Sequence, residues 1–299
     1  MEKENTLQTP AIKKTWLRIL LFMLAFLFVL ILTEGIMTVI MAKFLNVEIF
    51  KLPEILMKDP DFIHIHIISQ LVSLLTTFIL AAVFRKFIDR RSIVSMGYAI
   101  KGRFLDVING FLVGLLLISL GFVILIITNN LEVESITYNL KIIIFSFIFF
   151  LFAAMVEEIV FRGYILNNLL SSMKNKYLAL LISALLFALI HGLNPNLSLL
   201  SMVNLIIAGI ALGISYIYTQ NLWFPIFLHV SWNYFQGPIF GFEVSGMNAA
   251  SIIKQNITGN DIITGGDFGF EGSIILTLLL VIMIYLTNFI YKRKTNSII

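Results

Sequence analysis

The chain has 299 residues, of which 59% are hydrophobic and 13% are charged, and it carries a net charge of +4 at neutral pH. Soluble domains carry roughly a quarter charged residues, so this composition excludes an ordinary water-soluble fold. Cysteine is absent, which excludes disulfides and thiolate metal sites, and the basic residues stand in short clusters beside apolar runs, a pattern that does not indicate a nucleic-acid partner.

Apolar segments follow one another along the whole chain, each long enough to cross a bilayer as a helix. A hydrocarbon core about 30 Å thick requires roughly 20 helical residues. We expect helices at residues 16–42, 62–87, 104–128, 140–168, 177–192, 202–219, 222–240 and 273–291. The sequence therefore predicts an all-α polytopic membrane helix bundle of about eight transmembrane helices, with the lipid bilayer as its surroundings.

Lysine and arginine predict how the bundle is oriented. Basic residues cluster at the N-terminus, in the loop at 85–103, in the turn at 174–176 and in the tail at 292–294, whereas the alternate connections are acidic or mixed. Cytoplasmic loops carry an excess of Lys and Arg. Eight spans place every basic cluster on one side, so both termini are predicted to be cytoplasmic in an integral protein of the cell membrane.

Three parts are expected along the chain. Residues 1–139 hold the first three helices, residues 140–240 hold a core of helices four to seven, and residues 241–299 hold an outer loop and the last helix. The stretch at 241–272 is rich in Gly, Asn, Thr and Asp, which is typical of loops. We interpret it as a solvated connector in preference to a partner surface.

Charged residues interrupt the fourth predicted helix. An ionisable group inside a bilayer costs about 2.5–3.5 kcal/mol, so each one calls for a partner or a purpose. Glu158 and Arg162 are spaced i,i+4, which predicts an ion pair on one helix face. Glu157 points about 100° away from that face and is free to face a cavity.

Two later helices carry polar residues at comparable depth. His191 lies in the fifth predicted helix, and His229 and Asn233 lie one turn apart in the seventh. We expect these three side chains and Glu157 to meet in one membrane-buried pocket. Interhelical hydrogen bonding alone, typically worth about 0.6 kcal/mol per contact, is the structural alternative for each residue taken singly.

The chemistry that this set supports is hydrolysis. Glu157 is the candidate general base for a water molecule. His229 and Asn233 are candidate hydrogen-bond donors to the oxyanion of a tetrahedral intermediate, and His191 would orient the water or hold a metal. Glu157, His191 and His229 also match a catalytic zinc shell with an open fourth position. Zinc or another divalent metal is therefore the candidate cofactor, and the sequence leaves metal-bound and metal-free water open.

The polar residues also carry a family resemblance. The chain reads Glu-Glu-x-x-x-Arg at 157–162, Phe-x-x-x-His at 187–191 and His-x-x-x-Asn at 229–233. In this order the three motifs resemble those of the CPBP intramembrane proteases, also called the CAAX-protease and bacteriocin-processing family. The resemblance spans roughly residues 140–235.

That resemblance implies roles and a range of substrates. It implies Glu157 as the water-activating residue, Glu158 and Arg162 as supporting residues, and His191, His229 and Asn233 as further site residues. It implies cleavage near the C-terminus of prenylated proteins in eukaryotic members. Bacterial members have less uniform roles, which include peptide maturation and self-protection against bacteriocins.

The functional prediction is an intramembrane endopeptidase that acts on a peptide or protein in or at the membrane. A non-catalytic immunity or scaffold protein could keep the same fold and bind without cutting. A secondary transporter would be expected to have interrupted helices in corresponding halves, whereas the polar residues here gather in the second half. Phe187 is expected to pack beside His191 and to take no part in the chemistry.

Overall fold

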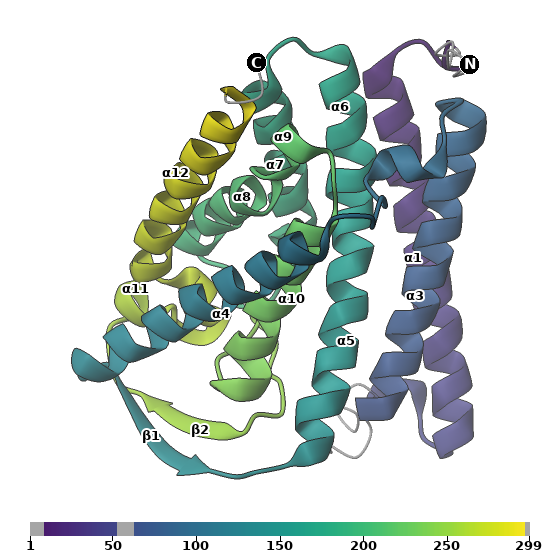
Figure 1. Cartoon of the computed structure of the whole chain (residues 1–299). Helices are drawn as coiled ribbons and strands as arrows, with labels where there is room; N and C mark the ends of the chain where they lie inside the picture. Colours follow the sequence, from purple (N-terminus) through teal and green to yellow (C-terminus); the bar gives the residue numbers. More distant parts are fainter. Residues whose placement is uncertain (1–8, 53–62, 297–299) are drawn as a thin grey trace.

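The computed structural model describes residues 9–52 and 63–296, which form a bundle of helices with one small two-stranded sheet (Figure 1). Within these residues, seven helices are long and apolar enough to span a membrane. The predicted all-α polytopic fold is confirmed. The first residue of the second predicted helix, residue 62, lies outside the described residues.

Helices make up nearly all of the described bundle. In chain order they are α1 (Thr15–Leu45), α3 (Ile63–Val83), α4 (Phe104–Ile127), α5 (Leu140–Glu158), α6 (Asn167–Ser172), α7 (Lys176–Ile190), α8 (Leu199–Gly213), α9 (Tyr216–Thr219), α10 (Trp223–Tyr234), α11 (Asp261–Thr264) and α12 (Ile274–Asn296). The start of α1 and the end of α12 lie at one end of the bundle, which we call the terminal end (top of Figure 1). The opposite end is called the loop end.

Two short strands lie at the loop end, where the sequence indicated only an acidic connection. Strand β1 (Leu131–Ile136) pairs antiparallel with β2 (Ile253–Ile257), with Leu131 opposite Ile257. The sheet therefore joins the connection after α4 to the long segment between α10 and α12 (Figure 1).

The fourth predicted helix is continuous but changes its winding. The α-helix α5 passes through a π-helical turn at Ile159–Leu166 into α6, so that Leu140–Ser172 forms one span of 33 residues. Single π turns inside α-helices are rare and are frequent at functional sites. This turn begins directly after Glu158 and contains Arg162.

The seventh predicted helix also changes its winding along its length. Where residues 222–240 were expected, α10 (Trp223–Tyr234) continues into a π-helical turn at Phe235–Ile239 that contains Pro238. The helical stretch is therefore close to its predicted bounds, although it is not among the seven spans. The helix begins beside the segment that leads into α4, where the Leu222 amide donates to the Gly97 carbonyl at 3.0 Å, and most of its residues are buried among its neighbours.

Close packing of α4 against α10 holds this helix in place. A side chain at Gly110 would collide with the backbone of Phe224, and one at Gly114 would collide with the backbone of Leu228 and Trp232. The two glycines have the spacing that lets membrane helices approach closely. They therefore position the helix that carries His229.

We expect Gly114→Ala to lower the free energy of unfolding by about 1–3 kcal/mol, because the added methyl group overpacks the contact between α4 and α10. The matched control is Gly35→Ala, since a Cβ on Gly35 meets no heavy atom of the described structure within 4 Å. Denaturant titration of both variants in the same detergent tests this. Equal stability of the two variants would contradict the assigned role of Gly114.

A buried polar network at the terminal end connects the N-terminal helices to the core. Asp89 is fully buried and accepts hydrogen bonds from Arg18 at 2.7 Å, Arg85 at 3.2 Å and Asn168 at 3.0 Å. Arg85 also donates to Asn167 at 2.6 Å. Breaking a buried ion pair typically costs 3–5 kcal/mol, so this network fixes α1 and α3 against α6.

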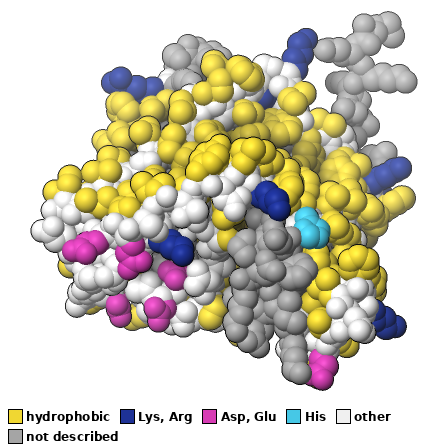
Figure 2. Space-filling view, turned by 90° about the horizontal axis from the view of Figure 1, so that it is seen from below, with side chains coloured by type: hydrophobic (Ala, Val, Ile, Leu, Met, Phe, Trp, Pro, Cys, Tyr) yellow, Lys and Arg dark blue, Asp and Glu magenta, His cyan; other side chains and the backbone are white. Residues whose placement is uncertain are grey.

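The segment at 241–272 is not the solvated connector that its composition indicated. Phe268 and Phe270 are fully buried, and Glu271 is only 7% exposed. Exposed carboxylates lie instead on the sheet and the nearby turns, and Figure 2, which views the molecule from the loop end, shows acidic side chains gathered on this face. The segment thus folds back into the bundle.

Candidate active site

A single cavity of about 330 Å³ contains the predicted polar residues. Its walls come from α5, α7, α8 and α10, with contributions from α1, α3 and the segment before α12. Glu157, His191, His229 and Asn233 all line it. The structure therefore brings together the four side chains that the sequence placed in one pocket.

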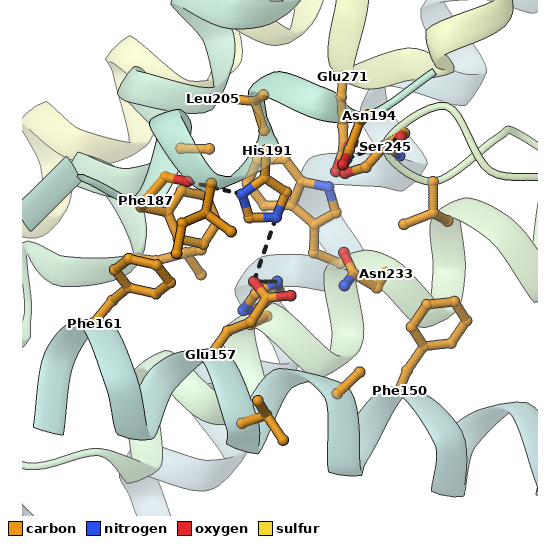
Figure 3. Close-up of a pocket in the computed structure, with 18 of the residues that line it drawn as sticks. Phe150, Glu157, Phe161, Phe187, His191, Asn194, Leu205, Asn233, Ser245 and Glu271 are labelled. Carbon is orange, nitrogen blue, oxygen red and sulfur yellow. Dashed lines mark hydrogen bonds and ion pairs between the residues drawn. The ribbon is translucent and has the colours of Figure 1, made fainter. Parts of the chain in front are cut away.

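Glu157 reaches the cavity from the last turn of α5 (Figure 3). Its Oε2 atom lies 3.8 Å from Nε2 of His191 and 3.8 Å from Nε2 of His229. These separations exceed hydrogen-bond length, and Oε2 is buried without a hydrogen-bond partner in the described structure. Its lone pairs are thus directed at the cavity and are available to a reacting molecule.

Glu158 performs a different task from its neighbour. Its side chain is fully buried, and Oε1 accepts from Arg162 Nη1 at 2.8 Å and lies 2.9 Å from His229 Nδ1. Arg162 also donates to the Gly209 carbonyl at 3.0 Å. The predicted ion pair between Glu158 and Arg162 is confirmed, and it forms the back wall that holds His229.

The hydrogen bonds of the two histidines determine which ring nitrogen faces the cavity. His191 Nδ1 lies 2.8 Å from the Phe187 carbonyl, which can only accept, so Nδ1 carries the proton. Glu158 likewise accepts from His229 Nδ1. In the neutral form of either ring, Nε2 is therefore an acceptor facing Glu157.

Aromatic side chains build the floor around these groups. The Phe187 ring packs against His191 with centroids 4.5 Å apart, and the Arg162 guanidinium lies 4.9 Å from the Phe187 centroid. Phe187 thus packs beside His191, as expected. Trp232 lines the cavity and donates to Gln236 at 2.8 Å, so it is held inside the bundle.

Asn233 lies one turn after His229 and borders the cavity from the same helix face. Its side chain makes no hydrogen bond to the described residues. An amide in this state offers an N–H donor to a bound molecule. Figure 3 shows this amide beside the cavity on the α10 side, across from the Glu157 carboxylate.

The side chains of the cavity are of the types that bind a metal ion, but in the described structure they lie too far apart to bind one. Glu157, His191 and His229 are the ligand types that zinc prefers, and each histidine has the second hydrogen bond that orients a ligand ring. Among the described residues, no group of three or more His, Asp or Glu side chains lies close enough to hold an ion.

The sequence analysis missed Glu271 and Ser245, which come from the segment after α10. Both line the cavity, and Glu271 Oε2 accepts from the amide and the hydroxyl of Ser245 at 2.7 Å each. Burial raises the pKa of the Glu271 carboxyl, against the effect of these two hydrogen bonds. The only feature of the sequence that could have indicated Glu271 as a site residue is its position as a charged residue directly after Phe270.

Residues 139–235 match the family model described as type II CAAX prenyl endopeptidase Rce1-like. Over this segment the chain is similar to the Rce1-like family. The Rce1-like segment contains all three motifs and runs from the start of α5 into the π-helical turn after α10. The match confirms the resemblance to the CPBP intramembrane proteases and supports an intramembrane endopeptidase of the CAAX type.

The Rce1-like segment supplies the cavity walls that carry Glu157, His191, His229 and Asn233, whereas α1, α3 and the segment before α12 contribute from outside the match. No curated protein and no solved structure shows a significant match to the chain. The apolar helices and the match together indicate an integral membrane protein.

Proposed function

We propose that this protein hydrolyses a peptide bond in a membrane-associated peptide or protein, with water activated by Glu157. The observation that carries the proposal is the buried Glu157 Oε2 atom, which has no hydrogen-bond partner and lies 3.8 Å from two imidazole nitrogens. The Rce1-like segment supports the same reaction class. The cavity of about 330 Å³ is large enough for an unwound stretch of peptide.

Glu157 acts first as a base and then as an acid. The water oxygen forms a bond to the carbonyl carbon, one water proton passes to Glu157, and the carbonyl oxygen becomes an oxyanion. The carbon–nitrogen bond then breaks, and the proton held by Glu157 passes to the departing amine. The products are a new carboxyl terminus and a new amino terminus.

His229 and Asn233 stabilise the oxyanion in this scheme. Asn233 donates from its amide. His229 donates from Nε2 when the ring is protonated, and Glu158, 2.9 Å from Nδ1, compensates the charge of that ring. His191 keeps its proton on Nδ1, so its Nε2 accepts from the attacking water and orients it toward the substrate.

Asn233→Ala is expected to lower kcat by about 10²- to 10³-fold, which is the usual loss when one oxyanion donor is removed. Because the side chain makes no hydrogen bond to the described residues, the substitution should leave the thermal unfolding midpoint nearly unchanged. Initial rates at saturating substrate, compared with unfolding curves, test this. A rate equal to that of the wild type would exclude Asn233 from the oxyanion site.

A metal-assisted version of the reaction would use the same residues. Glu157, His191 and His229 would hold a divalent ion, which would lower the pKa of a bound water and polarise the substrate carbonyl. We expect metal analysis of protein purified without chelator, together with activity after dialysis against a chelator, to separate the two versions. A stoichiometric ion, with activity lost on its removal and restored on its return, would establish the metal-assisted version.

The experiment that tests the function uses purified protein in lipid nanodiscs. It is incubated with a pool of membrane-associated peptides, prepared with and without C-terminal prenyl groups, and new termini are identified by mass spectrometry. Cleavage restricted to prenylated peptides would indicate a CAAX-type substrate, and cleavage of apolar peptides without lipid would indicate peptide maturation such as bacteriocin processing. Binding without new termini would favour the immunity or scaffold alternative.

A further inference from the structure

The short helical turn Phe270–Gly272 brings a second carboxylate to the cavity. Glu271 is only 7% exposed and lines the cavity together with Ser245 and Asn194. Its main-chain carbonyl accepts from Asn204 at 2.8 Å, which fixes the turn to α8. In Figure 3 its carboxylate points from the upper edge of the cavity toward the centre, whereas Glu157 rises from the lower edge.

Only one oxygen of the Glu271 carboxylate accepts hydrogen bonds from the described residues. Oε2 accepts both hydrogen bonds from Ser245, at 2.7 Å each. Oε1 accepts no hydrogen bond from the described residues. The contact with Ser245 uses only Oε2. It therefore does not explain why a carboxylate, with a second oxygen, stands at this position.

The neighbouring groups are acceptors as well. Asn194 donates from Nδ2 to the Ser245 carbonyl at 3.1 Å, which leaves its amide oxygen as an acceptor. Figure 3 shows the oxygen atoms of Glu271, Asn194 and Ser245 gathered at one corner. A corner of this kind suits a group that only donates, which is the character of an ammonium or guanidinium group.

No lysine or arginine compensates Glu271 among the described residues of the cavity wall, although the imidazoles of His191 and His229 act to lower the pKa of its carboxyl. The described lining residues include Glu157, Glu271 and two histidines but no lysine or arginine. Arg162, the guanidinium that belongs to the site, is directed at Glu158 and the Gly209 carbonyl. A buried charge is costly unless it is paired, so the corner favours a cation brought by a ligand.

We propose that Glu271 and Asn194 form a subsite that binds a lysine or arginine side chain of the substrate, so that the protein selects membrane-associated peptides with a basic residue near the bond to be cut. The inference rests on the proposed function and adds its substrate class. Glu271 lies outside residues 139–235, the part that matches the Rce1-like family. The matched segment therefore does not itself supply this carboxylate.

The test measures binding without cleavage, in the Glu157→Gln background, which also removes the other cavity carboxylate. Fluorescent leucine–alanine peptides of about 20 residues, long enough to span a bilayer, carry one Lys that moves by one position from peptide to peptide. Each has a partner with Gln at the same position. The dissociation constants of each pair are compared in nanodiscs.

At one Lys position we expect the Lys peptide to bind about 10- to 100-fold more tightly than its Gln partner, the usual range for a hydrogen bond to a charged group. Adding Glu271→Gln should reduce this ratio to about one, because the amide keeps an acceptor for Ser245 but loses the charge. The matched control adds Glu243→Gln, which changes a carboxylate of the same segment outside the cavity and should keep the ratio.

Two results would overturn the subsite: the absence of a Lys preference at every position, or a preference that survives Glu271→Gln. If the Glu271→Gln protein fails to fold, Asn194→Ala takes its place and is expected to lower the ratio severalfold. Failure of the proposed function is seen separately, since the wild type would then release no new termini from Lys peptides that it binds.

Discussion

Replacing Glu157 by glutamine is expected to abolish peptide-bond cleavage and to leave the protein folded. Glutamine has nearly the same shape but cannot accept a proton from water, and loss of a general base typically costs about 10²- to 10⁴-fold in rate. Stability should change little, because Glu157 Oε2 makes no hydrogen bond in the described structure. Release of new peptide termini by wild type and variant, with thermal unfolding of both, is the measurement.

The matched control for this substitution is Glu34→Gln. Glu34 is a carboxylate of α1 that accepts hydrogen bonds from the Ser69 and Ser73 hydroxyls of α3 and does not line the cavity. Its replacement by glutamine should leave the cleavage rate within about twofold of the wild-type rate. Glu34 shares no partner with the cavity residues, and such separate sites act independently. Cleavage retained by Glu157→Gln would rule out this residue as the base and favour another carrier of the proton.

Arg162→Met is expected to cost about 3–5 kcal/mol of stability, the usual loss when one partner of a buried ion pair is removed. Glu158 is fully buried and would retain only the His229 ring as a partner. The matched control is Arg103→Met, because Arg103 and Asp106 form a partly exposed ion pair, a type worth about 0–1 kcal/mol. Denaturant titration measures both variants.

A second substitution separates the loss of charge pairing from the loss of packing. Glu158→Gln combined with Arg162→Met removes both charges, so we expect the double variant to be more stable than Arg162→Met alone. Its cleavage rate should stay low, because glutamine can still accept from His229 Nδ1 but cannot compensate a protonated ring. Strictly additive losses of stability would contradict the ion-pair assignment.

The two adjacent glutamates, Glu157 and Glu158, have different surroundings because of the geometry of the helix. On the helix their side chains point about 100° apart, so one faces the protein interior and the other faces the cavity. Glu158 is fully buried and bonded to Arg162, whereas 30% of the Glu157 side chain is exposed. The spacing to Arg162 in the sequence was sufficient to assign these directions.

Several features of the fold could be predicted because they depend on short stretches of chain. An apolar run long enough to cross the bilayer favours a membrane helix wherever it occurs, and α1, α4 and α5 begin within one residue of their predicted starts. The i,i+4 pair of Glu158 and Arg162 is likewise local. The three motifs indicated the family for the same reason, since each lies within one turn or two of a helix.

Other features depended on contacts between distant parts of the chain and were wrong or missing. The apolar run at 222–240 predicted a regular helix, but α10 passes into a π-helical turn at Phe235–Ile239. The spacing of Gly110 and Gly114 is a sequence signal for close helix packing, but it does not say that α10 is the helix they meet. The pairing of β1 with β2 joins residues more than a hundred positions apart, which no local pattern reports.

The sequence by itself determined the membrane fold, the family motifs and the four side chains of the candidate site. The tertiary structure decided that Glu271 joins them, that both histidines turn Nε2 toward Glu157, and that the segment at 241–272 closes the cavity. The physical reason is the separation along the chain of the residues that interact. Transfer into the bilayer and helix spacing act within one segment, whereas a hydrogen bond such as that from Ser245 to Glu271 exists only after the whole bundle has packed.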